Sequence, residues 1–67
     1  MRRVLKLEMI RAGISRHELA KLLGISYLSL CQKINGERDF KLNECLAIKL
    51  ILNSELPVEE LFMKEVL

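Results

Sequence analysis

The chain has 67 residues, of which 51% are hydrophobic and only 4% aromatic, and its formal net charge is +2. A chain of this length supports a single domain, residues 1–67, with a small core, because such a domain buries roughly 60% of the surface of its unfolded chain. Leu and Ile are abundant, Thr is absent and no alternating run of β-branched residues occurs. These features argue against a strand-based fold and predict an all-α one.

Membrane, disulfide and metal classes are also disfavoured. The two cysteines, Cys31 and Cys45, are too few for a disulfide framework, and we expect both to lie reduced on the inner faces of helices. Lys6 and Glu8 interrupt any signal-peptide core near the N-terminus. The longest apolar run, residues 45–52, contains a lysine and is far shorter than the roughly 20 residues of a membrane span. We therefore expect a soluble cytoplasmic protein without a metal site or a membrane partner.

The first predicted helix covers residues 3–12. Leu5, Met9 and Ile10 are expected to face the core. Gly13 follows the last helical residue, where a left-handed backbone conformation commonly ends a helix.

The second predicted helix covers residues 16–23 and opens with a capping box. The Ser15 hydroxyl accepts the Glu18 amide, and the Glu18 carboxylate reaches back to the Ser15 amide. Gly24 ends this helix. Its apolar stripe consists of three leucines: Leu19, Leu22 and Leu23.

The third predicted helix covers residues 27–34, starts after a Ser26 cap and ends at Asn35 and Gly36. Its apolar positions are Tyr27, Leu30, Cys31 and Ile34. Two short helices joined by so tight a turn form the layout of a helix-turn-helix, which can hold one helix rigidly outward. Reading a DNA groove requires such a helix.

The rest of the chain predicts two more helices. Phe40 is expected to fold back between helices and fill the core. The fourth helix, residues 42–52, is apolar on most sides, which is typical of a central buried helix. Pro57 suits the first turn of a fifth helix, where its missing amide costs nothing. The inner face of that helix would be formed by Val58, Leu61 and Phe62.

The charge is unevenly distributed along the chain. Up to Lys41 there are nine basic and four acidic residues, a net +5, whereas two basic and five acidic residues follow, a net −3. The basic part is the part that contains the helix-turn-helix. Such an asymmetry suits a polyanionic partner on one side of the molecule, although charges of both signs also simply solvate helix surfaces.

Together these motifs resemble the Cro and lambda-repressor-like helix-turn-helix family, in the form found in phages and prophages, over nearly the whole chain. The resemblance is carried by the Ser-x-x-Glu-Leu-Ala start at residues 15–20, the Gly-Ile-Ser turn at 24–26, Leu30, and the segment 33–40 with its Asn-Gly and its Phe. It implies a compact five-helix domain that acts as a sequence-specific transcriptional regulator, a repressor, and binds a double-stranded DNA operator as a homodimer without a cofactor or small-molecule ligand. Lys33 departs from the pattern, since many members bury an aliphatic residue there.

The resemblance also implies which residues meet DNA, because the family lays the third helix in the major groove. Base contacts are expected from Tyr27, Leu28, Ser29 and Gln32. Phosphate contacts are expected from Arg16, His17, Lys33, Asn35, Arg38 and Lys41. The basic start, Arg2 and Arg3, could also reach the backbone. The dimer surface is expected at Leu61, Phe62, Met63, Val66 and Leu67, although some of these side chains could instead complete the core of the monomer.

The sequence leaves one other class of function open and disfavours a second. A protein-interaction module of the same fold, such as an antitoxin-like or anti-repressor partner, is the alternative, because an exposed Leu28 equally suits a protein interface. An enzyme is disfavoured: the chain has one His, one Asp, no Cys/His cluster and no phosphate-cradling glycine loop, so no nucleophile has a base beside it.

Overall fold

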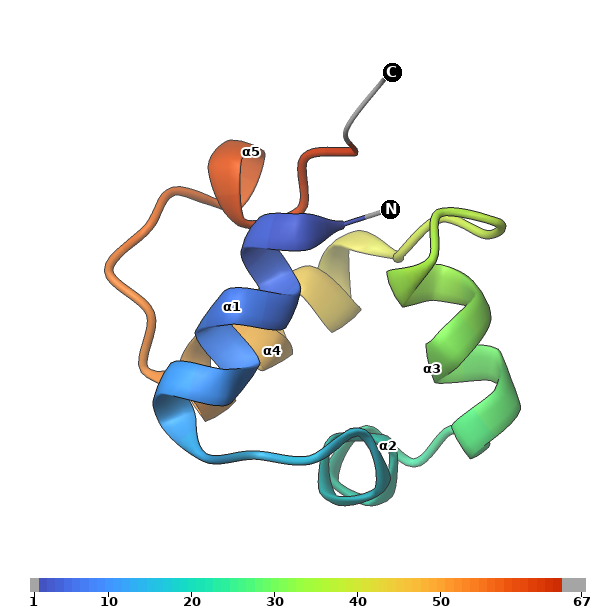
Figure 1. The fold of residues 1–67 in the computed structure, drawn as a ribbon. Helices are drawn as coiled ribbons and strands as arrows, with labels where there is room; N and C mark the ends of the chain where they lie inside the picture. The colour runs from blue at the N-terminus through green and yellow to red at the C-terminus, as the bar shows by residue number, and fades with distance from the viewer. Residues whose placement is uncertain (1, 65–67) are drawn as a thin grey trace.

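The computed structural model describes residues 2–64, and this part of the chain consists of five helices without a strand (Figure 1). The helices are α1 (Arg3–Ala12), α2 (Arg16–Leu23), α3 (Tyr27–Ile34), α4 (Leu42–Leu52) and α5 (Val58–Leu61). The predicted all-α five-helix architecture is thus confirmed, with the first four ranges as expected. Pro57 lies one residue before α5, as its N-cap. None of these helices is long and apolar enough to cross a membrane.

Local signals set the ends of the helix-turn-helix pair. The Glu18 amide donates to the Ser15 hydroxyl over 3.2 Å, and the Ser15 amide donates back to the Glu18 carboxylate over 3.4 Å. The Ser29 amide donates to the Ser26 hydroxyl over 3.0 Å and starts α3. Gly24 ends α2 at a φ of 71°, a conformation that only glycine adopts at little cost. The turn between α2 and α3 is therefore fixed by short-range chemistry.

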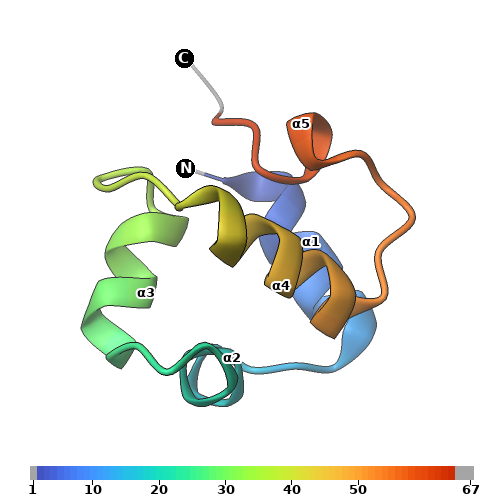
Figure 2. The same ribbon diagram turned by 180° about the vertical axis from the view of Figure 1, so that it is seen from behind.

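All five helices contribute to one core. α1 and α4 lie on opposite broad faces, α2 crosses one end and α3 stands at one side (Figures 1 and 2). Phe40 folds back as predicted and meets Phe62 edge-to-face, with 5.1 Å between the ring centroids. The buried residues of the core are Leu5, Met9, Leu19, Ala20, Leu30, Ile34, Ile48, Leu52 and Leu61.

Several apolar residues that were predicted to face the core are instead exposed. Ile10 and Leu22 both lie largely in solvent. The stripe of α1 that packs inward is Leu5 and Met9, four residues apart, and Ile10 points about 100° away from Met9 around the helix axis. The expectation that α4 is buried on most sides is also wrong. Its inner face is buried, but three of its leucines, Leu42, Leu46 and Leu50, are exposed.

Candidate nucleic-acid interface

The outward face of α3 carries the four residues predicted to contact bases. Leu30, Lys33 and Ile34 are buried, so the helix turns its opposite side to solvent. Leu28 and Gln32, one turn apart, form the centre of that side, and Leu28 is 66% exposed. Ser29 lies along one edge of this face, and Tyr27 lies along the other edge together with Cys31. These side chains provide one amide, two hydroxyls and an apolar tip.

The N-terminal turn of α2 supplies two side chains along the Tyr27 edge. The His17 ring stacks on Tyr27, with centroids 4.0 Å apart and planes 14° apart. Nη1 of Arg16 lies 3.5 Å from the Sγ atom of Cys31. The pKa of the Tyr27 hydroxyl is raised, mainly by its hydrogen bond with Cys31, so the group stays protonated at neutral pH. Two side chains from the start of α2 are thus held beside α3.

Cys31 differs from its prediction as an inner-face residue. It is only partly buried and lies between α2 and α3, whereas Cys45 is buried as expected; both thiols are free. Burial raises the pKa of the Cys45 thiol. Sequence reasoning missed the position of Cys31 because its side chain points more than 90° away from Leu30 around the helix.

The loop after α3 places another arginine on the Ser29 edge. Nη1 of Arg38 donates to the Ser29 hydroxyl over 3.2 Å. The amides of Glu37 and Arg38 both donate to the Gln32 carbonyl, over 2.9 and 3.3 Å, which fixes the loop to the end of α3. No acidic residue occurs in α3 itself. The central pair of Leu28 and Gln32 therefore has a guanidinium group on either side, from Arg16 and from Arg38.

Two further predicted phosphate contacts, Asn35 and Lys41, are exposed at the ends of neighbouring helices. Asn35 is the C-cap of α3. Lys41 precedes α4, where its amide donates to the Glu44 carboxylate over 2.9 Å. Both side chains are accessible to a partner.

Lys33 is not available as a phosphate contact, and that prediction is corrected. The residue is 4% exposed, and its Nζ atom lies 2.7 and 2.8 Å from the two carboxylate oxygens of Glu44. It follows the buried Leu30 by three residues, so it lies on the inner face of α3. There it lies above the ring of Phe40, 6.0 Å from the centroid. A buried ion pair thus joins α3 to the start of α4.

The acid stability of the fold is expected to depend on this ion pair. Burial by itself raises the pKa of Glu44, but the hydrogen bonds from Lys33 and Lys41 outweigh it and lower the pKa below the usual 4.5. A carboxyl with a lowered folded-state pKa stabilises the fold above its unfolded pKa, and this contribution is lost as the pH falls through the folded value. The melting temperature, followed by circular dichroism, should therefore fall mainly below a pH of about 4.5.

A Glu44→Gln variant provides the control for this prediction. It should be less stable at neutral pH, because Lys33 loses its counter-charge, and its melting temperature should change less on acidification. Its melting temperature should still depend somewhat on pH, because the pKa of Glu8 is also lowered, mainly by its hydrogen bond with Arg11. A wild-type melting temperature that stays constant down to a pH of about 3 would contradict the role given to Glu44.

Arg2 is a second buried cation, so its side chain does not reach the DNA backbone, which the sequence had left open for it. It is 5% exposed, and its guanidinium donates to the carbonyls of Lys33, Phe62 and Arg38 over 2.9, 2.6 and 3.4 Å. It also lies 5.2 Å from the Phe40 ring centroid. Arg2 thereby holds together the end of α3, the following loop and the end of α5.

The predicted dimer residues occupy unlike environments. Leu61 is completely buried in the core, so its prediction as an interface residue is corrected. Phe62 is partly buried against Phe40, whereas Met63 is largely exposed. The remaining two, Val66 and Leu67, lie outside the described residues.

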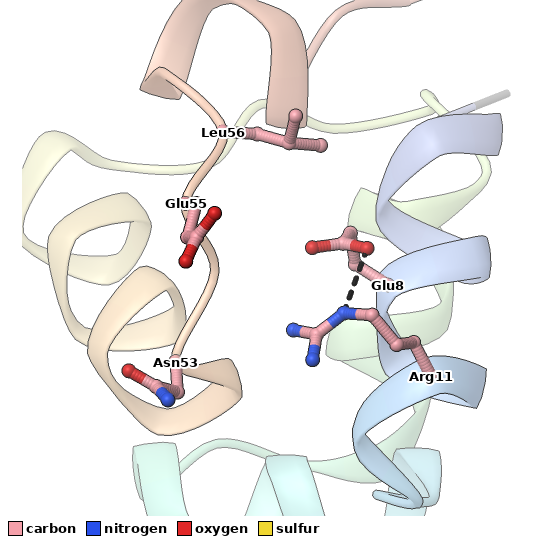
Figure 3. Close-up of a pocket in the computed structure, with 5 residues that line it drawn as sticks. All are labelled: Glu8, Arg11, Asn53, Glu55 and Leu56. Carbon is pink, nitrogen blue, oxygen red and sulfur yellow. Dashed lines mark hydrogen bonds and ion pairs between the residues drawn. The ribbon is translucent and has the colours of Figure 1, made fainter.

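A pocket of about 370 Å³ opens elsewhere, between α1 and the segment after α4 (Figure 3). Nε of Arg11 lies 3.0 Å from the Glu8 carboxylate, and Nη2 donates to the Leu52 carbonyl over 2.8 Å. The second carboxylate oxygen of Glu8 accepts from the Ser54 hydroxyl over 2.8 Å. These polar groups bind one another, so the hydrogen bonds beside the pocket join α1 to the end of α4 and the residues after it. Its remaining lining comes from Asn53, Glu55 and Leu56.

In the part of the chain that the structure describes, no group of three or more His, Cys, Asp or Glu side chains could hold a metal ion. No family model, curated protein or solved structure matches the chain.

Proposed function

We propose that the chain is a sequence-specific DNA-binding transcriptional regulator, a repressor of the phage or prophage type, which inserts the outward face of α3 into the major groove. The observation that supports this most is the outward face of α3, where Leu28 and Gln32 are flanked by Arg16 and Arg38. A major groove about 12 Å wide admits one helix and has phosphates along both walls. A helix with a cation on either edge suits that shape.

The side chains of this face suit readout of bases. Gln32 offers an amide that can pair with N6 and N7 of adenine, and Leu28 offers an apolar contact to a thymine methyl. Ser29 can donate or accept. Tyr27 keeps its proton and can donate to a base edge or a phosphate oxygen.

The phosphate contacts would come from both sides of α3. Arg16 and His17 lie in the first turn of α2, where free amides and the helix dipole attract an anion. Arg38 can present its planar fork to phosphate oxygens from the opposite edge. Asn35 and Lys41 would extend the contacts along the strand.

A single domain of this size makes few base contacts, so we propose that it acts as a homodimer. Two copies would read half-sites about 34 Å apart, one turn of the duplex. The resemblance to Cro-like regulators supports this arrangement.

Two substitutions separate the proposed roles of readout and anchoring. Gln32→Ala should reduce the preference for the selected sequence by about 1–3 kcal/mol, because the Gln32 amide can hydrogen-bond to a base edge and the alanine methyl group cannot. Arg38→Ala should weaken binding to all duplexes alike and reduce the slope of log affinity against log salt by about 1. Both should be measured by fluorescence anisotropy, on a duplex selected from a random pool and on a scrambled one.

Arg11→Gln is the charge-matched control, since Arg11 lies in the last turn of α1 and its guanidinium contacts Glu8 and the Leu52 carbonyl, not α3. It should leave both affinities nearly unchanged. Equal loss of specific and non-specific binding by Gln32→Ala and Arg38→Ala would contradict the assigned roles. Absence of salt-sensitive binding of the wild type to any duplex would contradict the function itself, and would favour the protein-interaction alternative that the exposed Leu28 suggests.

A further inference from the structure

The outer face of α4 is an apolar surface that DNA binding does not use. Leu42, Leu46 and Leu50 follow one another at intervals of four residues and are 70%, 50% and 80% exposed. Residues four apart lie on one side of a helix, so the three form a continuous row. We call this row the leucine stripe.

The leucine stripe is large for a chain of this size. Together its three members expose roughly as much surface as two complete leucine residues, and burial of such surface is a main driving force of association. α4 lies on the broad face opposite α1 (Figure 2), and α1, α2 and α5 pack against its other sides. Clustered exposed apolar side chains of this kind mark interaction surfaces.

We propose that the leucine stripe pairs with the same stripe of a second copy, with the two α4 helices antiparallel about a twofold axis through Leu46. The stripe is symmetric about this residue, since Leu42 precedes it by four positions and Leu50 follows it by four. A twofold interface requires a patch that is complementary to itself. In this pairing Leu46 meets the partner's Leu46, and Leu42 meets the partner's Leu50.

The charges around the leucine stripe are compatible with such a seam. Glu44, the acidic residue in the first turn of α4, points inward to Lys33 and does not enter the seam. Lys49 donates to the Leu56 carbonyl of its own chain and would face the partner's Asn43 in this register. No like charges therefore meet across the axis, and the paired row contains only leucines.

The exposed area sets the strength of the dimer. A stable interface buries about 800 Å² on each partner, more than three leucines provide alone, so a dissociation constant in the micromolar range is expected. The alternative surface near α5 is smaller in the described part of the chain. There Leu61 is buried and Phe62 partly so, which leaves Met63 as its exposed apolar side chain.

The pairing goes beyond the proposed function and does not rest on it. α3 stands to one side of α4, near the N-terminal end of that helix (Figure 2). Antiparallel α4 helices therefore carry the two α3 helices to opposite ends of the dimer. Since the pairing is tested without DNA, its failure and the failure of DNA binding can be told apart.

Sedimentation equilibrium of the 67-residue chain, from about 1 µM to about 1 mM, tests the proposal. The mean mass should rise from 7.8 kDa toward twice that value. Leu46→Glu sets two carboxylates against each other at the axis and should weaken association by at least about 100-fold. Ile10→Glu removes an exposed apolar side chain from α1 instead and should leave association unchanged. Circular dichroism should show both variants folded.

A charge pair tests the register independently. Leu42→Lys and Leu50→Glu should each weaken the dimer, whereas a chain carrying both should recover at least about tenfold over either, because each new lysine faces the partner's new glutamate. The proposal is overturned if the wild type remains at 7.8 kDa throughout, if Met63→Glu dissociates the dimer and Leu46→Glu does not, or if the double variant is no better than the single ones.

Discussion

Replacing Lys33 by Met is expected to destabilise the fold by about 3 kcal/mol, because the Glu44 carboxylate would remain buried without its counter-charge. The side chains of Lys33 and Glu44 are 5% and 11% exposed, so water can replace little of the lost interaction. A small domain has only about 5–15 kcal/mol of stability in total, so this loss should be plain in urea unfolding at neutral pH.

The double variant Lys33→Met with Glu44→Leu should regain most of this loss. Apolar residues of similar volume often replace a buried ion pair at little cost. About 1 kcal/mol should remain missing, since Glu44 also accepts the Lys41 amide at the start of α4. A double variant as unstable as the single one would show that the pair itself, and not the orphaned carboxylate, dominates the stability of this region.

Replacing Arg2 by Ala is also expected to destabilise the fold by about 3 kcal/mol. The guanidinium donates to three backbone carbonyls from three different segments, and each hydrogen bond to a charged group contributes about 1.5–3 kcal/mol before relaxation. After substitution, water is expected to reach some of these carbonyls, so the losses should not add fully. Urea unfolding measures the total.

The same substitution should loosen the loop that carries Arg38. Amide hydrogen exchange of residues 36–40 should accelerate more than that of α2, and affinity for all duplexes should fall with it. Arg2→Lys keeps the charge but loses the planar guanidinium that donates to several carbonyls, so its loss of stability should lie between those of the wild type and Arg2→Ala. A stability change within about 0.5 kcal/mol for Arg2→Ala would contradict the central position of this side chain.

The sequence predicted the helices well because their ends are decided locally. Ser15, Glu18 and Ser26 bond to amides within three residues, and Gly13 and Gly24 supply the left-handed residues where helices end. These signals lie within one turn of the position that they affect, so no knowledge of the tertiary fold is needed to read them.

Rotation of the helices and the burial of cations could not be predicted in the same way. α4 is apolar on most sides, so its sequence does not distinguish the packed face from the leucine stripe. Arg2 and Lys33 look like ordinary surface cations until Phe62 and Glu44 approach them, and these partners are 60 and 11 residues away. The orientation of α3 could be predicted, because Leu30 and Ile34 are apolar residues four apart and mark its buried side. The four residues predicted to contact bases therefore lie on the opposite, outward face.

The position of Arg2 affects when this domain can assemble. The backbone amide of Arg2 donates to the Ile34 carbonyl, and its side chain reaches the carbonyl of Phe62. During translation, the hydrogen bond between the Arg2 side chain and the Phe62 carbonyl therefore forms only after the segment that contains Phe62 has been synthesised. Until Phe62 has been synthesised the chain lacks this hydrogen bond, and α3, with eight residues, is too short to be a stable helix in water by itself.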